Sequence, residues 1–254
     1  MGGSDAKNAD RATGVLATTP TLADEKLSAV DLSVRTAMTF KVNEGVLQKL
    51  LPAGFEMNSP AAGPAKGANL AITLIDYLMV QDPEGKSLPP RSTVAMNIPS
   101  KKTATGEPVG MVIGGFILEA GVPGAYFNFG AAKISVNRQS HTVDGKSIID
   151  ETWDIKANDG SALEVVLQFE RGVPARGKVE TKIHSAAKPE FYRIYKFEQA
   201  TDVVRSASMG LDRATKFNIK ASGPKLAPLF DGTQQVVSIT SVPYYSRTIY
   251  IPTM

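Results

Sequence analysis

The chain of 254 residues is long enough for one large domain, and folding at this size buries about 75% of the surface that the unfolded chain exposes. Its formal net charge is +3, from 28 basic and 25 acidic residues that are well mixed, so the charge pattern gives no indication of a nucleic-acid or anionic-membrane partner. The sequence has no cysteine, which excludes disulfides, zinc–thiolate sites, iron–sulfur clusters and thiol nucleophiles.

Residues 1–29 are rich in Ala, Thr, Asp, Gly and Lys and show no sustained apolar period. We predict a flexible arm here, followed by one domain over residues 30–254. The first residues lack the basic and apolar regions of a secretory signal, and no run of about 18 apolar residues is present to span a bilayer. We therefore expect a cytoplasmic protein with no membrane partner; an already removed signal is the alternative.

The pattern changes at Leu32. The segment LSVRTAMTFKV, residues 32–42, alternates well enough to predict a strand. In the following NEGVLQKLLPAGFE, Asn43 is a candidate N-cap, the apolar residues have helical spacing, and Pro52 and Gly54 form a stop signal. This segment predicts a short helix.

Most of the remaining chain consists of strand patterns separated by Gly, Pro and Asp turns. Asp144-Gly145 and Asp159-Gly160 are typical of tight turns between antiparallel strands. The predicted strand regions are residues 69–81, 89–100, 106–119, 126–136, 141–172, 191–222, 234–242 and 246–252, with a loop or short helix at 223–232. The fold class is therefore β-rich α+β, with mostly antiparallel sheets and few short helices, which argues against a doubly wound nucleotide-binding fold.

The motifs of the common cofactor and nucleophile sites do not occur. GMVIGG at residues 110–115 matches neither a dinucleotide fingerprint nor a P-loop. His141 and His184 have no carboxylate at ligand spacing, so we expect no metal and no cofactor. There is no Gly-x-Ser-x-Gly elbow, and acidic pairs such as Glu151 with Asp154 are typical of solvated charges.

Lys133 lies in the otherwise apolar and aromatic run AYFNFGAAKISVN, residues 125–137. If residues 126–136 form one unbulged strand, Phe127, Phe129, Ala131 and Lys133 share a face. Burial of an amine on such a face lowers its pKa and leaves a neutral nucleophile for a carbonyl. The alternative, which the pattern alone favours, is a surface lysine whose stem covers apolar groups while its ammonium reaches water.

Four segments together resemble the acetoacetate decarboxylase superfamily over residues 32–252. They are VLQKLLPAGFE, NLAITLIDYLMV, the aromatic-Gly-x-x-Lys motif at residues 129–133, and APL within GPKLAPLFDG. The resemblance implies mostly antiparallel sheets curled around a central cavity, and a homo-oligomer. It also makes Lys133 the Schiff-base lysine; a register shifted by one residue would place Ala132 there instead.

The sequence departs from the family pattern beside this lysine. The family's Gly-Arg-Glu triplet corresponds to Ala125-Tyr126-Phe127, and its second lysine corresponds to Ile134. Because charges are replaced by apolar and aromatic groups, we expect a small-molecule carbonyl substrate that is larger and more apolar than acetoacetate.

The resemblance implies a lyase acting on a keto acid or related carbonyl compound, by decarboxylation, retro-aldol cleavage or dehydration through an imine at Lys133. Tyr126 or Arg91 is a candidate for orienting a carboxylate or enolate oxygen, and Glu119 or Glu151 for moving protons. The candidate substrate-binding residues are Tyr126, Phe127, Phe129 and Ala131.

Two other functions fit the same scaffold. One is a lysine-independent hydrolase, isomerase or cyclase of a hydrophobic secondary metabolite. The other is a small-molecule binding protein without catalytic activity, because a fold does not determine a function.

Overall fold

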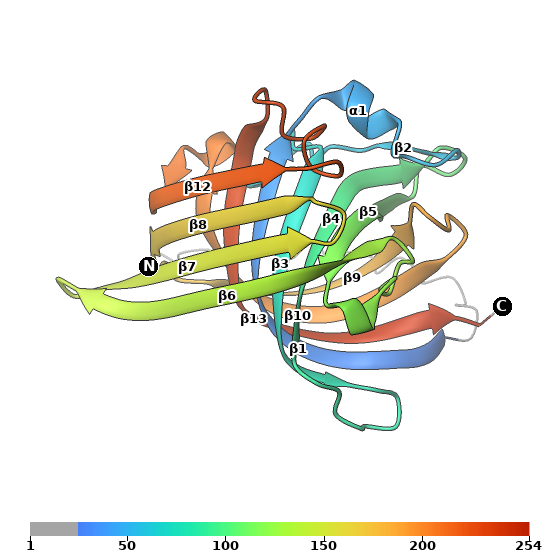
Figure 1. The fold of residues 1–254 in the computed structure, drawn as a ribbon, viewed down its shortest axis with the longest axis horizontal. Helices are drawn as coiled ribbons and strands as arrows, with labels where there is room; N and C mark the ends of the chain where they lie inside the picture. The colour runs from blue at the N-terminus through green and yellow to red at the C-terminus, as the bar shows by residue number, and fades with distance from the viewer. Residues whose placement is uncertain (1–24, 254) are drawn as a thin grey trace, which may run out of the picture.

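The computed structural model describes residues 25–253, in which strands dominate and helices are few and short (Figure 1). The helical segments are α1 (Glu44–Gln48), η1 (Glu119–Gly121) and η2 (Ala207–Met209). The strands are β1 (Glu25–Lys41), β2 (Phe55–Met57), β3 (Leu70–Gln81), β4 (Arg91–Lys102), β5 (Pro108–Ile117), β6 (Phe129–Val143), β7 (Lys146–Ala157), β8 (Ala162–Glu170), β9 (Ala175–Ser185), β10 (Tyr192–Ser206), β11 (Leu211–Asp212), β12 (Ala214–Ser222) and β13 (Gln235–Pro252). The predicted β-rich class is confirmed.

Seven strands close into a ring. They are hydrogen-bonded in the order β5-β9-β10-β13-β1-β3-β4, and β4 pairs back with β5. All neighbours in the ring are antiparallel except β5 and β9, which pair in parallel over a short stretch. The prediction of mostly antiparallel strands curled into a closed structure is confirmed.

A second, antiparallel sheet of β6, β7, β8 and β12 joins the ring through a short parallel pairing between β5 and β6. Figure 1 shows β7, β8 and β12 crossing in front of the ring strands. Only the first residues of β6 pair with the ring, so most of β6 lies outside the interior of the closed sheet.

Strand alternation divides the ring residues between two environments. On β1, Met38 and Phe40 face outward and join a core with Trp153 and Ile155 of β7 and Leu167 of β8. Each fully buried side chain of this size contributes about 1.5–3 kcal/mol. Residues at the alternate positions point into the ring instead, and there they line a cavity.

Several local predictions are confirmed by the structure. The amide oxygen of Asn43 accepts a hydrogen bond of 2.9 Å from the backbone N–H of Gly45 and caps α1. Asp144 and Gly145 both have positive φ, 50° and 78°, in the turn between β6 and β7. This turn favours residues that tolerate the left-handed region, as Asp and Gly do.

Three predicted boundaries are wrong. Residues 25–29 belong to β1 and not to an arm; the rest of the predicted arm lies outside the described residues. The two closing strands are one, β13, which continues through Pro243. The strand predicted over 126–136 begins only at Phe129, because Phe127 lies in a turn with φ 62°.

Glu151 connects the two sheets. Its carboxylate is 2% exposed and accepts hydrogen bonds from Thr36 of β1 at 2.8 and 2.9 Å, from the indole N–H of Trp153, and from Arg138 Nε at 3.3 Å. Arg138 Nη2 forms an ion pair with the same carboxylate at 3.2 Å. This location, between the sheets and outside the cavity, does not suit the proton-transfer role considered from the sequence.

We expect Glu151→Ala to lower the free energy of unfolding by about 3 kcal/mol, because it leaves buried donors without an acceptor. Asp154→Ala is the control, since that carboxylate is 43% exposed on the same strand and its ion pair is with the exposed Lys156. The control should change stability by about 0.5 kcal/mol or less. Chemical denaturation measures both, and equal effects would contradict this role of Glu151.

Candidate functional site

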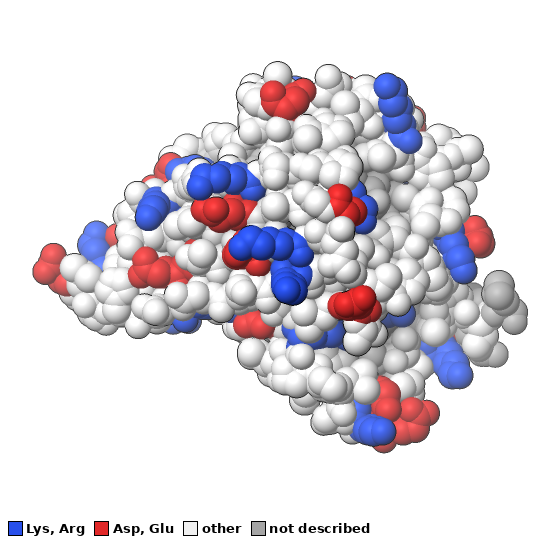
Figure 2. Space-filling view, viewed as in Figure 1, with Lys and Arg blue, Asp and Glu red and all other residues white. Residues whose placement is uncertain are grey.

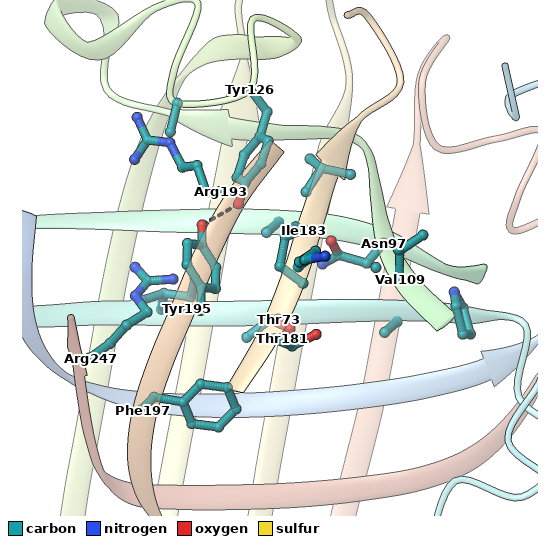
Figure 3. A pocket seen from close by; sticks show the side chains of 18 of the residues that line it. Thr73, Asn97, Val109, Tyr126, Thr181, Ile183, Arg193, Tyr195, Phe197 and Arg247 are labelled. Carbon is teal, nitrogen blue, oxygen red and sulfur yellow. Dashed lines mark hydrogen bonds between the residues drawn. The ribbon is translucent and has the colours of Figure 1, made fainter. Parts of the chain in front are cut away.

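The ring encloses a cavity of about 920 Å³ that is partly open to solvent. Its walls come from all seven ring strands and from the loop before β6 (Figure 3). This volume is near the upper end of the range for sites that take drug-sized ligands. The lining includes apolar side chains, among them Ile75, Ala95, Val112 and Ile183.

A charged cluster of Asp31, Arg35 and Arg247 lies on the wall. Asp31 of β1 is directly opposite Arg247 of β13 in the antiparallel register. Arg247 donates to one oxygen of Asp31 from Nε at 2.8 Å and from Nη2 at 2.6 Å, and Nη2 of Arg35 lies 3.4 Å from the other oxygen. The three residues are 1%, 7% and 5% exposed. Two guanidinium groups face one carboxylate, so the buried cluster has a net charge of +1.

Both guanidinium groups make cation–π contacts with tyrosine rings. Arg35 lies over the ring of Tyr245, 3.3 Å from its centroid, and Arg247 lies 4.1 Å from the centroid of Tyr195. Burial lowers the pKa of Arg35, and the neighbouring Arg247 lowers it further. Burial also raises the pKa of Tyr245 to about 12, so this ring remains neutral at physiological pH. Arginine keeps its proton in proteins, so the cluster attracts an anionic group.

Two tyrosine hydroxyls meet inside the cavity. Tyr126, from the loop before β6, donates a hydrogen bond to the hydroxyl oxygen of Tyr195 on β10, and Figure 3 shows the two rings pointing toward each other. Burial raises the pKa of Tyr126 well above its usual value, and the contact with Tyr195 raises it further. Because its pKa is raised, the Tyr126 hydroxyl keeps its proton at neutral pH and can donate this hydrogen bond.

Three polar atoms on cavity residues have unused hydrogen-bonding capacity. Thr93 Oγ1, Arg91 Nε and Arg193 Nε are buried and have no partner among the described residues. Buried polar atoms are usually hydrogen-bonded. Unpaired ones on a cavity wall indicate groups that a ligand or water would satisfy.

Lys182 of β9 is the only lysine among the described residues that line the cavity. Its amine lies 2.7 Å from Glu107, which also pairs with Lys102 at 3.0 Å. The hydrogen bond with Glu107 raises the pKa of Lys182, and the same pair lowers the pKa of Glu107. Lys182 is therefore an ammonium at neutral pH and is a poor nucleophile for a carbonyl.

The structure brings three of the residues selected from the sequence to the cavity: Arg91, Tyr126 and Phe129. Tyr126 and Phe129 are buried and pack edge to face at 6.4 Å. The Phe129 ring lies so close to the backbone of residue 115 that a Cβ there would be 1.8 Å from the ring, which explains why this residue is glycine.

Lys133 does not lie in the cavity. It is exposed on β6, opposite Lys156 of β7, while its neighbours Ala132 and Ile134 face the core between the sheets. The interpretation that buried its amine on an aromatic face is wrong, for two reasons. Phe127 lies in a turn and is not part of the strand face assumed for Lys133, and β6 leaves the ring after Ala131, before it reaches Lys133.

The other selected residues also lie outside the cavity lining. Glu119 is exposed on η1, and Ala131 is half-buried on β6. Phe127 is 38% exposed; its ring packs against Phe191 at 5.0 Å and below the ammonium of Lys188 at 3.9 Å.

Sequence reasoning missed the charged cluster and Tyr195. One signal was present: Asp31, Ser33 and Arg35 occupy alternate positions of a strand whose other positions are mostly apolar. Such alternation indicates a polar face but not its burial. The partner Arg247 is distant in sequence, so no local pattern could place it beside Asp31.

Among residues 25–253, no group of three or more His, Cys, Asp or Glu side chains is arranged to hold a metal ion. The same part of the chain contains no helix that is both long and apolar enough to cross a membrane.

No known protein family and no curated protein matches the chain at a significant level. Solved structures do match it along most of its length. The enduracididine biosynthesis enzyme MppR with HEPES buffer bound has a TM-score of 0.54 at 11% identity, covering 93% of this chain and 96% of that one. An acetoacetate decarboxylase-like enzyme from Sphingomonas wittichii RW1 has 0.52 at 11%, covering 94% and 95%.

Acetoacetate decarboxylase from Legionella pneumophila subsp. pneumophila str. Philadelphia 1 is similar with a TM-score of 0.51 at 12% identity, covering 98% of both chains. At this level of identity the likeness shows the fold and leaves the reaction open. The chain therefore has an acetoacetate decarboxylase-like fold, as the order of its segments predicted.

Proposed function

We propose that the protein is a lyase-type enzyme for a keto acid or related carbonyl compound that is larger and more apolar than acetoacetate, with the ligand carboxylate bound by Arg35 and Arg247. The observation that carries this proposal is the net positive charge of the buried cluster on the cavity wall. An unbalanced charge away from water is costly. A ligand carboxylate would balance it and accept charge-assisted hydrogen bonds.

The cavity supports an apolar body for this ligand. Its volume of about 920 Å³ suits a drug-sized molecule, and aliphatic side chains are among those that line it. Among proteins of this fold, MppR has been crystallised with pyruvate and with the condensation product of pyruvate and imidazole 4-carboxaldehyde. Those ligands belong to that protein, and they support a keto acid here by analogy of fold alone.

The two arginines favour some reactions over others. In decarboxylation the carboxylate loses its charge as CO₂ forms, so tight binding by Arg35 and Arg247 stabilises the ground state more than the transition state. In retro-aldol cleavage or dehydration the carboxylate keeps its charge throughout. Within the lyase class, the cluster therefore supports retro-aldol cleavage or dehydration.

A lysine-independent route is supported by the state of Lys182, whose pairing with Glu107 raises its pKa and keeps its amine protonated. The competing proposal is an imine at Lys133. It is supported by the motif Phe129-Gly130-Ala131-Ala132-Lys133. The two routes differ in whether a covalent adduct forms.

We expect Arg35→Met to weaken binding of 2-naphthoate, an apolar aromatic carboxylate used as a probe, by about tenfold or more. Binding of neutral 2-naphthamide should not change. Arg35 is the better choice for substitution because the closer pair of Asp31 and Arg247 remains intact and neutral. Isothermal titration calorimetry measures both ligands.

The matched control is Arg176→Met, because Arg176 lies on β9 with its side chain 77% exposed. It should leave both affinities as in the wild type. Wild-type protein that binds 2-naphthoate no more tightly than 2-naphthamide would contradict the proposed carboxylate site.

Incubation with phenylpyruvate and borohydride distinguishes the imine route from the lysine-independent route, because borohydride reduces an imine to a stable covalent adduct. We expect no added mass on any lysine, and we expect Lys133→Ala to bind phenylpyruvate as the wild type does, because Lys133 is exposed on β6. Intact-mass measurement and peptide mapping give the readout. A reduced adduct at Lys133 that is absent in Lys133→Ala would establish the imine route, and an adduct at Lys182 would overturn the lysine-independent route.

A further inference from the structure

We propose that Tyr126 and Tyr195 form a binding site for a ligand oxygen that carries negative charge, such as the oxygen of an enolate. This inference rests on the proposed function, because such an oxygen is formed when a carbonyl compound undergoes retro-aldol cleavage or dehydration. The step assigned to the tyrosines is stabilisation by hydrogen bonding. It requires no covalent bond to the protein.

The hydrogen-bond inventory of the pair supports this role. A tyrosine hydroxyl has one proton to donate. The proton of Tyr126 is used on the oxygen of Tyr195, whereas the proton of Tyr195 has no acceptor among residues 25–253. Because Tyr195 lines the cavity, a ligand oxygen is the available acceptor.

The first hydrogen bond also makes the second one stronger. In a chain of hydrogen bonds each bond polarises the next, and this effect is larger in a low-dielectric interior than in water. Tyr195 accepts from Tyr126 and is therefore a better donor than an isolated tyrosine. Burial raises the pKa of Tyr126, so Tyr126 continues to donate across the neutral pH range.

Nearby charge selects an anionic oxygen over a neutral one. Arg247 lies 4.1 Å from the ring centroid of Tyr195, and Arg193 lies 5.9 Å from that of Tyr126. Figure 3 shows both arginines beside the tyrosine pair. No carboxylate of the described chain is hydrogen-bonded to either hydroxyl, and Arg35 gives the Asp31–Arg247 pair an excess positive charge. A negative charge at this point therefore meets net positive charge and O–H dipoles.

The position of Tyr126 is fixed before any ligand binds. Its backbone carbonyl accepts a hydrogen bond from the Ser185 hydroxyl, and its ring packs edge to face against Phe129 and Phe191, at 6.4 Å in both cases. Donors that are already oriented need little reorganisation when charge develops on the ligand. The pair is therefore suited to stabilise a developing oxyanion.

The probes for this site are 2-naphthol, which has a hydroxyl and no carboxylate, and 2-naphthoate, which has the reverse. We expect the full chain to bind the naphtholate form about tenfold or more tightly than the naphthol form. This preference lowers the pH at which bound 2-naphthol ionises, and the absorbance spectrum follows that ionisation directly.

Substitution of both hydroxyls, Tyr126→Phe with Tyr195→Phe, should abolish the preference for naphtholate and leave the affinity for 2-naphthoate within about twofold. Tyr195→Phe alone should remove most of it, because Tyr195 holds the unused proton. Arg35→Met should give the opposite result, with weaker 2-naphthoate binding and a retained preference. Tyr244→Phe is the matched control, since Tyr244 is 42% exposed beside Tyr245.

These outcomes separate the two proposals. The tyrosine site is overturned if wild-type protein shows no preference for naphtholate, or if the double variant keeps it. If 2-naphthoate does not bind while the preference is present and depends on the tyrosines, the carboxylate site of the proposed function is wrong and the tyrosine site stands. Unchanged 2-naphthoate binding in the double variant also shows that the variant is folded.

Discussion

The pairing of β4 with β5 closes the ring of seven strands, and the cavity exists because of this closure. In an open sheet both faces must be covered or solvated, whereas a closed sheet has an inner face of its own. Strand alternation then gives ring strands such as β1 two functions. One set of side chains packs in the core with the second sheet, and the other set lines the cavity.

This division explains how charged residues can lie on strands that also build the core. Met38 and Phe40 of β1 are fully buried between the sheets, while Asp31 and Arg35 of the same strand face the cavity. The antiparallel register with β13 places Arg247 opposite Asp31. Apolar residues in place of a buried ion pair are often equally or more stabilising. A cluster with an excess cation on a cavity wall is therefore better explained by an anionic ligand than by stability.

The sequence predicted those features of the fold that depend on local patterns. Asn43 gave the start of α1, Asp144-Gly145 gave the hairpin between β6 and β7, and alternation gave most of the long strands. The ring strand β9 was missed, since it lies outside every predicted strand region. The order of the four segments that resemble the acetoacetate decarboxylase superfamily predicted the acetoacetate decarboxylase-like fold, which the solved structures support.

The site was harder to predict because it depends on a non-local register. Tyr126, Phe129 and Arg91, selected as site residues, line the cavity, whereas Lys133 does not, because β6 pairs with the ring only as far as Ala131. Nothing in the local pattern around residue 31 reveals a partner 216 residues later. Closure of the ring, which creates the inner face, is equally invisible to a window of ten or twenty residues.

The central claim is that Arg35 and Arg247 bind the carboxylate of an apolar ligand inside the ring. The most direct measurement is a crystal structure of the protein with 2-naphthoate bound. We predict that the carboxylate lies within hydrogen-bonding distance of both guanidinium groups and that the naphthalene ring contacts the apolar wall around Ile75 and Val112. A ligand bound outside the ring, or inside it with its carboxylate away from both arginines, would contradict the claim.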